Sequence, residues 1–282
     1  MLIVTELKAK YPLQLLLKAT GLARSVYYYH RASAQMVDSE MDLKEKIYNI
    51  FHTHKGRYGY RRVTYALRNS GIQVNHKRVQ RLMVAQGLKS KVRPKRYKSY
   101  RGRVGRTAPN LLNRVFYADK PNQKWVTDVT EFKVADQKVY LSPMIDLFNQ
   151  EVVSYEVRTS VTLPLVTDML KSAIRKLGEN EKPIIHSDQG WQYQNQAYQA
   201  QIKTHGLSQS MSRKGNCLDN AVAENFFGIL KTEMYHNENF NNADELIEAI
   251  KEYIEYYNND RIKQKLKGLS PIEYRNQALK AA

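Results

Sequence analysis

The sequence predicts an all-α front part followed by an α/β core in which helices flank a mixed sheet. In the front part, apolar residues recur at helical spacing up to about residue 90. From residue 115, three successive runs rich in Val, Ile, Tyr and Phe read as strands, and helical segments alternate with shorter strands after them. The charge divides in the same region: residues 1–110 hold 24 Lys and Arg against 5 Asp and Glu, whereas residues 111–282 hold 21 against 22. A chain of 282 residues is long enough for two separate cores.

The front part is predicted to contain two helical units and a linker. Residues 1–35 form a small helix-turn-helix-like unit, in which Gly21 separates two short helices. Residues 41–90 form a second helix-turn-helix unit, whose last helix begins after Asn75 as its N-cap. Residues 91–114 are rich in Lys and Arg with scattered Gly and Pro, so we expect an extended basic linker.

The one-sided positive charge indicates a polyanionic partner, because Lys and Arg release condensed counterions when they neutralise phosphates. The alternative is a solvated basic surface on a helical bundle. We favour double-stranded DNA as the partner and residues 41–90 as a DNA-binding domain, because the last helix of this unit has a basic face. The side chains expected to contact DNA lie in this unit and in the linker: Arg57, Arg61, Arg62, Lys77, Arg78, Arg81, Lys95, Arg96 and Arg101.

Composition excludes several classes of protein. No run of about 18 apolar residues is present, which argues against a membrane-spanning helix. The first 20 residues lack the pattern of a signal peptide, so we expect a cytoplasmic protein. The single cysteine, Cys217, excludes an internal disulfide and a cysteine-rich zinc site.

Residues 115–282 are predicted to form the α/β core. Runs over 123–134, 138–149 and 151–160 would pair as an antiparallel meander, with tight turns at Asp136-Gln137 and Asn149-Gln150. There follow a helix over 162–178, a strand over 183–188, a helix over 196–206, a strand over 207–212, and helices over 218–235 and 242–260. This order of elements is that of the ribonuclease H-like fold.

Three carboxylates of the core stand in apolar surroundings. Asp128 lies in the middle of the first strand run, Asp188 ends the run PIIHSD, and Glu224 lies in the helical segment AVAENFFGIL. A carboxylate in such a place is costly unless it is paired or binds a cation, although each one alone is compatible with a turn or cap. If the three converge at one end of the sheet, Mg²⁺ or Mn²⁺ would relieve their repulsion, because these hard cations prefer oxygen ligands. Two such ions can clamp the oxygens of a phosphodiester.

The spacing and the flanking residues of these carboxylates resemble a known family. Between Asp188 and Glu224 lie 35 residues, and the words WVTDVT, YLSPMIDLFNQEVV, HSDQGWQY, SRKGNCLDNAVAENFFGILKTE and YNNDRIKQKLKGLSPIEYR follow in order. In these motifs, from about residue 40 to 275, the chain resembles the DDE transposases of the insertion-sequence three family. It is most similar to their second-frame catalytic protein in the one-fifty subgroup, whose core is similar to that of retroviral integrases. The resemblance implies an α/β ribonuclease H-like catalytic core preceded by all-α helix-turn-helix DNA-binding units.

The resemblance also implies roles for individual residues. Asp128, Asp188 and Glu224 match the catalytic triad, which would bind two Mg²⁺ ions that Mn²⁺ can replace. Lys231, seven positions after the glutamate on the same helix face, would contact the DNA end, or would be an ordinary solvated lysine. Four residues belong to the second motif, and Gly190 among them is expected to permit a tight turn: His186, Gly190, Gln192 and Tyr193. Asp146 is expected to be structural rather than metal-binding, and Asn220 and Asn225 are expected to orient or cap the glutamate helix rather than to catalyse.

The implied activity is metal-dependent DNA cleavage and strand transfer at the terminal inverted repeats of an insertion sequence. The implied partners are the repeats, the target DNA, a second copy of the chain in at least a dimer, and an upstream-frame protein fused by frameshifting. The protein would act in the bacterial cytoplasm, at the nucleoid when bound to DNA. Two alternatives remain: a DNA-binding regulator of transposition that needs the upstream-frame protein for catalysis, and a ribonuclease H-like nuclease.

Overall fold

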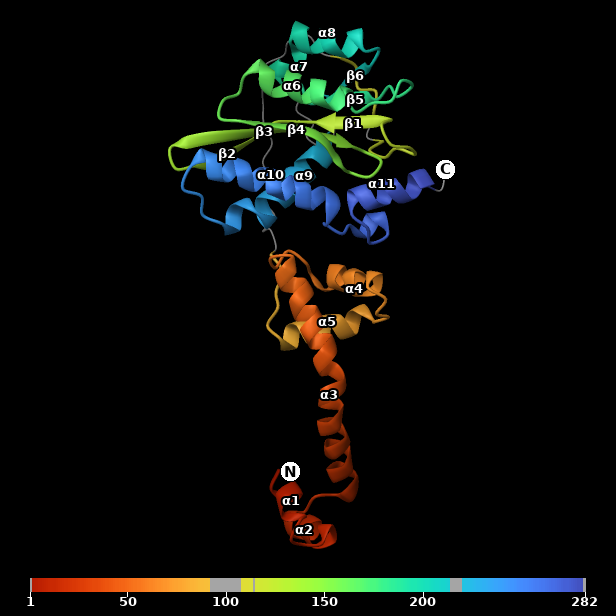
Figure 1. Cartoon of the computed structure of the whole chain (residues 1–282), viewed down its shortest axis with the longest axis vertical. Helices are drawn as coiled ribbons and strands as arrows, with labels where there is room; N and C mark the ends of the chain where they lie inside the picture. Colours follow the sequence, from red (N-terminus) through yellow and green to blue (C-terminus); the bar gives the residue numbers. More distant parts are fainter. Residues whose placement is uncertain (1, 92–107, 114, 214–219, 281–282) are drawn as a thin grey trace. The chain divides into compact units, whose positions relative to one another are not determined.

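A computed structural model describes residues 2–91, 108–113, 115–213 and 220–280, and it divides the chain into two compact units. The front unit comprises residues up to Ser90, and the core unit begins at Lys91 (Figure 1). We describe each unit by itself.

The described helices of the front unit are α1 (Leu2–Leu7), α2 (Leu13–Thr20), α3 (Arg24–Thr53), α4 (Tyr60–Asn69) and α5 (His76–Ala85). The predicted turn after α2 is confirmed: Gly21 has a φ of 66°, the left-handed conformation that closes helices. Val4, Leu17 and Tyr27 form a small core that holds α1 and α2 against the start of α3.

Helix α3 is longer than the separate helices that the sequence predicts in the front part. The sequence prediction placed a boundary between residues 35 and 41, whereas one helix runs from Arg24 to Thr53. The segment contains neither Gly nor Pro, so nothing in its local sequence breaks the helix. The two predicted units therefore share one long element.

The second helical unit forms as predicted. Ile47 of α3, Val63 and Leu67 of α4, and Val79 of α5 are buried in its interior. The side chain of Asn75 accepts a hydrogen bond from the backbone N–H of Lys77 at 2.9 Å, which confirms the predicted N-cap of α5.

The core unit contains one mixed sheet. Its strands are β1 (Lys124–Thr127), β2 (Thr130–Val134), β3 (Gln137–Asp146), β4 (Val152–Arg158), β5 (Ile184–Ser187) and β6 (Ser208–Met211). Strand β3 pairs antiparallel with β1, β2 and β4, whereas β5 pairs parallel with β1 and β6. The predicted meander is confirmed. Its first turn is one residue earlier than predicted, because Val134 pairs with Gln137 and Ala135 takes a φ of 46°.

Strands β1 and β2 share a single register against β3. Thr127 pairs with Met144 and Thr130 with Leu141, so the two residues between, 128 and 129, lie opposite 143 and 142. Residue 143 is proline, which has no N–H to donate to the ladder. We predicted that Asp128 lies inside a strand. It lies instead just after β1, at an opening of the ladder, where the regular hydrogen bonding to β3 is interrupted.

Helices cover both faces of the sheet (Figure 1). One layer contains α6 (Leu163–Ile174), the short α7 (Trp191–Gln194) and α8 (Gln196–Thr204), and the other contains α9 (Ala221–Glu233) and α10 (Ala243–Asn259). The chain continues through the short helices η2 (Tyr235–Asn237) and η3 (Gln264–Leu266) to α11 (Pro271–Lys280). Successive strand residues face opposite layers, since Trp125 packs in the α6 cluster and Val126 in the α9 cluster.

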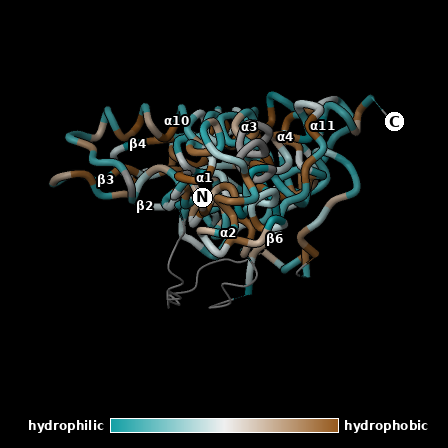
Figure 2. The backbone as a smooth tube through the Cα atoms, turned by 90° about the horizontal axis from the view of Figure 1, so that it is seen from below, coloured by the Kyte–Doolittle hydropathy of each residue, from teal (hydrophilic) through white to brown (hydrophobic). Residues whose placement is uncertain are grey.

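Hydrophobic and hydrophilic residues are interspersed along α10, β3 and β4 instead of forming one long apolar segment (Figure 2). In the part of the chain that the structure describes, no helix is long and apolar enough to cross a membrane.

Candidate active site

The register of two parallel strands brings Asp128 and Asp188 to the same edge of the sheet. Val126 of β1 pairs with His186 of β5, and each aspartate lies two residues beyond its strand's paired residue. Each aspartate follows the carboxyl end of its own strand, and these ends lie side by side in a parallel pair. Residues 60 positions apart in the sequence thus become neighbours.

The local chain holds one oxygen of each aspartate. Asp128 Oδ1 accepts a hydrogen bond from the N–H of Val129 at 2.8 Å, and Asp188 Oδ1 accepts one from the N–H of Gly190 at 2.8 Å. These bonds fix the orientation of both carboxylates without using their second oxygens.

Helix α9 begins beside the end of β1. Asn220, the residue before the helix, donates from Nδ2 to the carbonyl oxygen of Thr127 at 3.3 Å. Glu224 lies in the first turn of α9 and is exposed. The contact with Thr127 therefore places the start of Glu224's helix next to Asp128.

Two more side chains tie α9 and η2 to the free edge of β2. Lys231 Nζ donates to the carbonyl oxygen of Glu131 at 3.0 Å and lies 5.0 Å from the centre of the Phe132 ring. Tyr235 Oη donates to the carbonyl oxygen of Lys133 at 2.6 Å and accepts from its N–H at 3.1 Å. These contacts hold the end of α9 and the start of η2 against β2. No local sequence signal indicates these ties, because each joins residues at least 100 positions apart.

The electrostatics agree with three carboxylates that lie close together. Burial raises the pKa of Asp128 well above its usual range, and the charges of Asp188 and Glu224 raise it further. Burial also raises the pKa of Asp188, and partial desolvation raises that of Glu224. A divalent cation would relieve this repulsion, and carboxylate oxygens are the ligands that Mg²⁺ and Mn²⁺ prefer. The three carboxylates are thus of the right chemical type to bind such a cation. Among the described residues, however, no three His, Cys, Asp or Glu side chains lie close enough together to form a complete metal-binding group.

Gly190 is needed for space rather than for a special turn. Its φ is −59°, which any residue adopts, so the turn does not depend on a left-handed backbone at this position. A Cβ at this position would lie 2.9 Å from Asp188 Oδ1 and 2.6 Å from the side-chain nitrogen of Gln192. Any larger residue would therefore push against a carboxylate of the site.

Two other residues of the second motif, His186 and Tyr193, are buried beneath the candidate site. His186 is buried, with Nδ1 2.8 Å from Ser210 Oγ and Nε2 3.2 Å from Ser212 Oγ, which agrees with the expectation that it is not a metal ligand. Tyr193 is buried with its Oη 3.4 Å from Thr127 Oγ1. Burial, together with the charges of the nearby aspartates, raises the pKa of Tyr193 well above 10, so this phenol keeps its proton.

Asp146 has the structural role that we expected. Its two oxygens accept hydrogen bonds from the N–H groups of Asn122 at 2.8 Å and Phe148 at 2.9 Å. Burial raises the pKa of Asp146 to about 6.

The residues predicted to contact DNA in the loop before α4 differ in their exposure. Arg57 is only 7% exposed, so its side chain belongs to the interior of the unit, which corrects its assignment as a DNA contact. Arg62 is half-buried and donates to the carbonyl oxygen of Arg57 at 3.1 Å. Arg61 is exposed and lies over the ring of Tyr60. The predicted contacts in the linker lie outside the described residues: Lys95, Arg96 and Arg101.

Helix α5 presents the other predicted DNA contacts at its surface. Lys77, Arg78 and Arg81 are exposed, while Val79 of the same helix is buried. Glu40 of α3 lies 3.4 Å from Arg78 Nε and 2.5 Å from Arg81 Nη2. The hydrogen bond from Arg81 lowers the pKa of Glu40, so this carboxylate stays ionised and neutralises part of the basic face.

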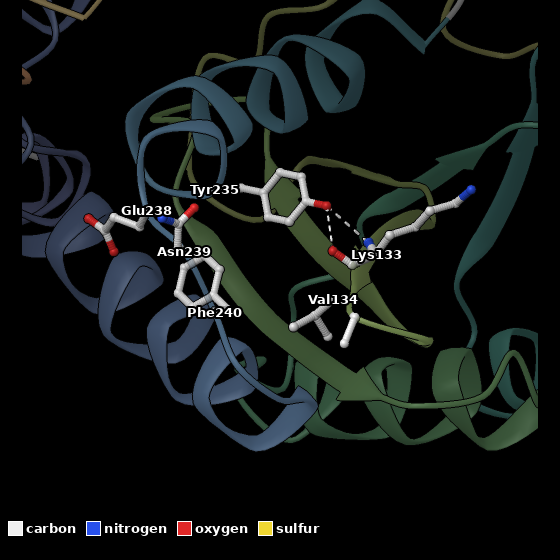
Figure 3. Close-up of a pocket in the computed structure, with 7 residues that line it drawn as sticks. Lys133, Val134, Tyr235, Glu238, Asn239 and Phe240 are labelled. Atoms are coloured by element: carbon white, nitrogen blue, oxygen red, sulfur yellow. Dashed lines mark hydrogen bonds between the residues drawn. The ribbon is translucent and has the colours of Figure 1, made fainter.

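A cavity of about 330 Å³ lies away from the carboxylates, at the turn between β2 and β3 (Figure 3). It is lined by Lys133, Val134, Ala135, Tyr235, Glu238, Asn239 and Phe240. The rings of Tyr235 and Phe240 are nearly parallel, and the phenol bonds to the backbone of Lys133. None of the three carboxylates lines this cavity, so it is not the candidate active site.

Comparison with known proteins gives concordant matches. Residues 118–217 and 224–279 match two family models described as integrase core domains, and residues 38–96 match an HTH-like domain. The chain is 55% identical to the "Putative transposase InsK for insertion sequence element IS150" of Escherichia coli, over 98% of each protein. It is 34% identical to the transposase InsF for insertion sequence IS3A of Escherichia coli, over 96% of each. A solved HTLV-2 integrase catalytic core with magnesium is 20% identical and covers 56% of this chain and 99% of its own, with a TM-score of 0.44.

Proposed function

We propose that the protein cleaves and joins DNA strands at the terminal inverted repeats of its element. The chain belongs to the insertion-sequence three family, whose transposases have an integrase core. The observation that carries this proposal is the convergence of Asp128 and Asp188 at one sheet edge, beside the first turn of the helix that bears Glu224.

The three carboxylates would hold two divalent cations, Mg²⁺ or Mn²⁺, which when bound activate the attacking oxygen and stabilise the leaving 3′-oxygen of a phosphodiester. Asp128 and Asp188 supply oxygens from the strand ends, and Glu224 supplies its own from α9. Cleavage uses water as the attacking group and frees a 3′-hydroxyl. Strand transfer then uses this hydroxyl to attack a second phosphodiester, with one P–O bond formed for each one broken.

The front unit would hold the terminal repeats through the basic face of α5, and Lys231 would approach the DNA end while it ties α9 to β2. Two DNA ends must meet for transposition, so we expect at least a dimer. The upstream-frame protein is an expected fusion partner.

The test uses labelled terminal-repeat DNA with Mg²⁺, and compares the protein with its Glu224→Gln variant and with a reaction in EDTA. Joined product is expected only from the unchanged protein with Mg²⁺. Joining by both proteins would remove Glu224 from the chemistry. DNA binding without joining by either protein would favour the alternative, a DNA-binding regulator that needs the upstream-frame protein for catalysis.

Replacing Arg78 and Arg81 together with Ala should weaken DNA binding at all sequences and lower the salt slope of the binding constant by about 2, one for each lost phosphate contact. The slope is measured by titrating terminal-repeat DNA at several salt concentrations. Lys46→Ala is the control, because Lys46 lies on α3 and not on the basic face of α5. A slope unchanged from that of the parent protein would exclude both arginines from the interface.

Gly190→Ala should lower strand joining about 100-fold, because displacing a reacting group by about 1 Å can have an effect of that size. The reason is the 2.9 Å approach of the new Cβ to Asp188 Oδ1. Joining rates and thermal unfolding are measured for the same protein. Gly178→Ala is the matched control, since its nearest contact would be an ordinary 3.6 Å. Equal joining rates for the two variants would show that the space at Gly190 is not needed.

A further inference from the structure

One large aromatic side chain beside the candidate active site is exposed. Trp191 is 55% exposed, whereas the next residue along α7, Gln192, and the one after it, Tyr193, are buried. Trp191 follows Gly190 directly and is three residues from Asp188, so their Cα atoms are at most about 11 Å apart. The exposed indole therefore lies in the neighbourhood of the candidate active site.

The backbone that carries Trp191 is fixed on both sides. Before it, the N–H of Gly190 donates to Asp188 Oδ1 at 2.8 Å. Gln189 Nε2 donates to the carbonyl oxygen of Ser212 at 3.0 Å, next to β6. After it, Tyr193 is buried and meets the ring of Tyr198 edge to face, with centroids 5.4 Å apart. The exposed indole therefore stands on a rigid support rather than on a loose loop.

The exposure of this indole is not explained by contacts within the described part of the chain. Within that part, Trp191 makes no hydrogen bond from its indole N–H and no contact with another ring. Both the N–H and the face of the ring are therefore available to a partner. A rigid aromatic surface at a site that acts on DNA matches the stacking platforms on which proteins hold unpaired bases.

We propose that Trp191 stacks on an unpaired nucleobase next to the scissile phosphodiester. This inference rests on the proposed function, since it names how the same site holds its DNA. When the base pair next to the scissile phosphodiester opens, the freed base loses its stacking partner. The indole replaces that partner, and any base can use it because every base has a π-face.

The decisive experiment compares paired and mismatched DNA ends. On fully paired terminal-repeat DNA, Trp191→Ala should lower the cleavage rate about tenfold, the effect of one lost base–aromatic contact. On DNA whose base pair next to the scissile phosphodiester is already mismatched, the rate of the variant should return to near that of the parent protein. Trp191→Phe should keep most of the activity on both substrates. Tyr117→Ala, at an exposed aromatic elsewhere in the core unit, is the control and should change neither rate.

A second readout does not require cleavage. With 2-aminopurine in place of the base next to the scissile phosphodiester, binding should quench its fluorescence for the parent protein and for Glu224→Gln, but not for Trp191→Ala. Absence of quenching by the parent protein would overturn the proposal, even if strands are joined. Quenching that survives Trp191→Ala, as expected if a second copy of the chain covers the indole, would overturn it as well. Quenching without any strand joining would support the stacking role and count against the proposed function alone.

Discussion

Asp188→Asn is expected to lower strand joining by about 10³-fold or more, because metal-ion catalysis contributes several kcal/mol to such reactions and this carboxylate would be a ligand. The asparagine oxygen can still accept the hydrogen bond from the N–H of Gly190, so the fold around the site is preserved. Without divalent cations, the variant should be at least as stable as the parent protein, since the charge of Asp188 raises the pKa of Asp128 and its removal relieves this repulsion. The combination of lost activity and retained stability separates catalysis from folding.

Joining assays and thermal unfolding curves in EDTA and in Mg²⁺ measure both effects. Mg²⁺ should raise the unfolding temperature of the parent protein but not that of Asp188→Asn. Asp168→Asn is the control, because Asp168 is a partly exposed carboxylate of α6 that pairs with Arg158. Joining by Asp188→Asn at the rate of this control would contradict the assigned site.

Arg261→Ala is expected to reduce the free energy of unfolding by about 3–5 kcal/mol, the effect of breaking a buried ion pair. The side chains of Arg261 and Glu233 are 2% and 8% exposed. The arginine donates from Nε and Nη2 to the two carboxylate oxygens at 2.8 and 2.7 Å, and Tyr253 Oη donates to the same carboxylate at 2.9 Å. Without Arg261, the charge of Glu233 would be left in the interior. Glu233 ends α9, so the helix that carries Glu224 would be loosened too.

Urea denaturation, followed by tryptophan fluorescence that changes as the buried Trp125 becomes exposed, measures the loss of stability of the core unit. Arg261→Lys should not restore it, because lysine lacks the planar fork that binds both oxygens. Arg158→Ala is the matched control: this arginine also pairs with acids but is 33% exposed, so its loss should change the free energy by no more than about 1 kcal/mol. An Arg261→Ala effect as small as that of the control would show that Glu233 is solvated or protonated in the variant.

The sequence singles out the three candidate carboxylates because their signals are local. A carboxylate among apolar residues is conspicuous wherever it stands, and the 35 residues between Asp188 and Glu224 can be counted without a structure. Strand and helix periodicity likewise depends on near neighbours, so the meander and the order of elements were confirmed. The sequence prediction did not include the continuity of α3, although residues 35–41 contain no local signal that ends a helix.

The sequence by itself thus determined the order of elements, the uneven charge and the identity of the three carboxylates. Only the tertiary structure decided that Asp128 stands at an opening of the ladder opposite Pro143, and that Asn220 ties α9 to the end of β1. It also decided that Arg57 is buried and that Trp191 is exposed. These properties depend on contacts between distant residues, and a contact of that kind is set by how the layers pack, not by the preferences of the residues that make it.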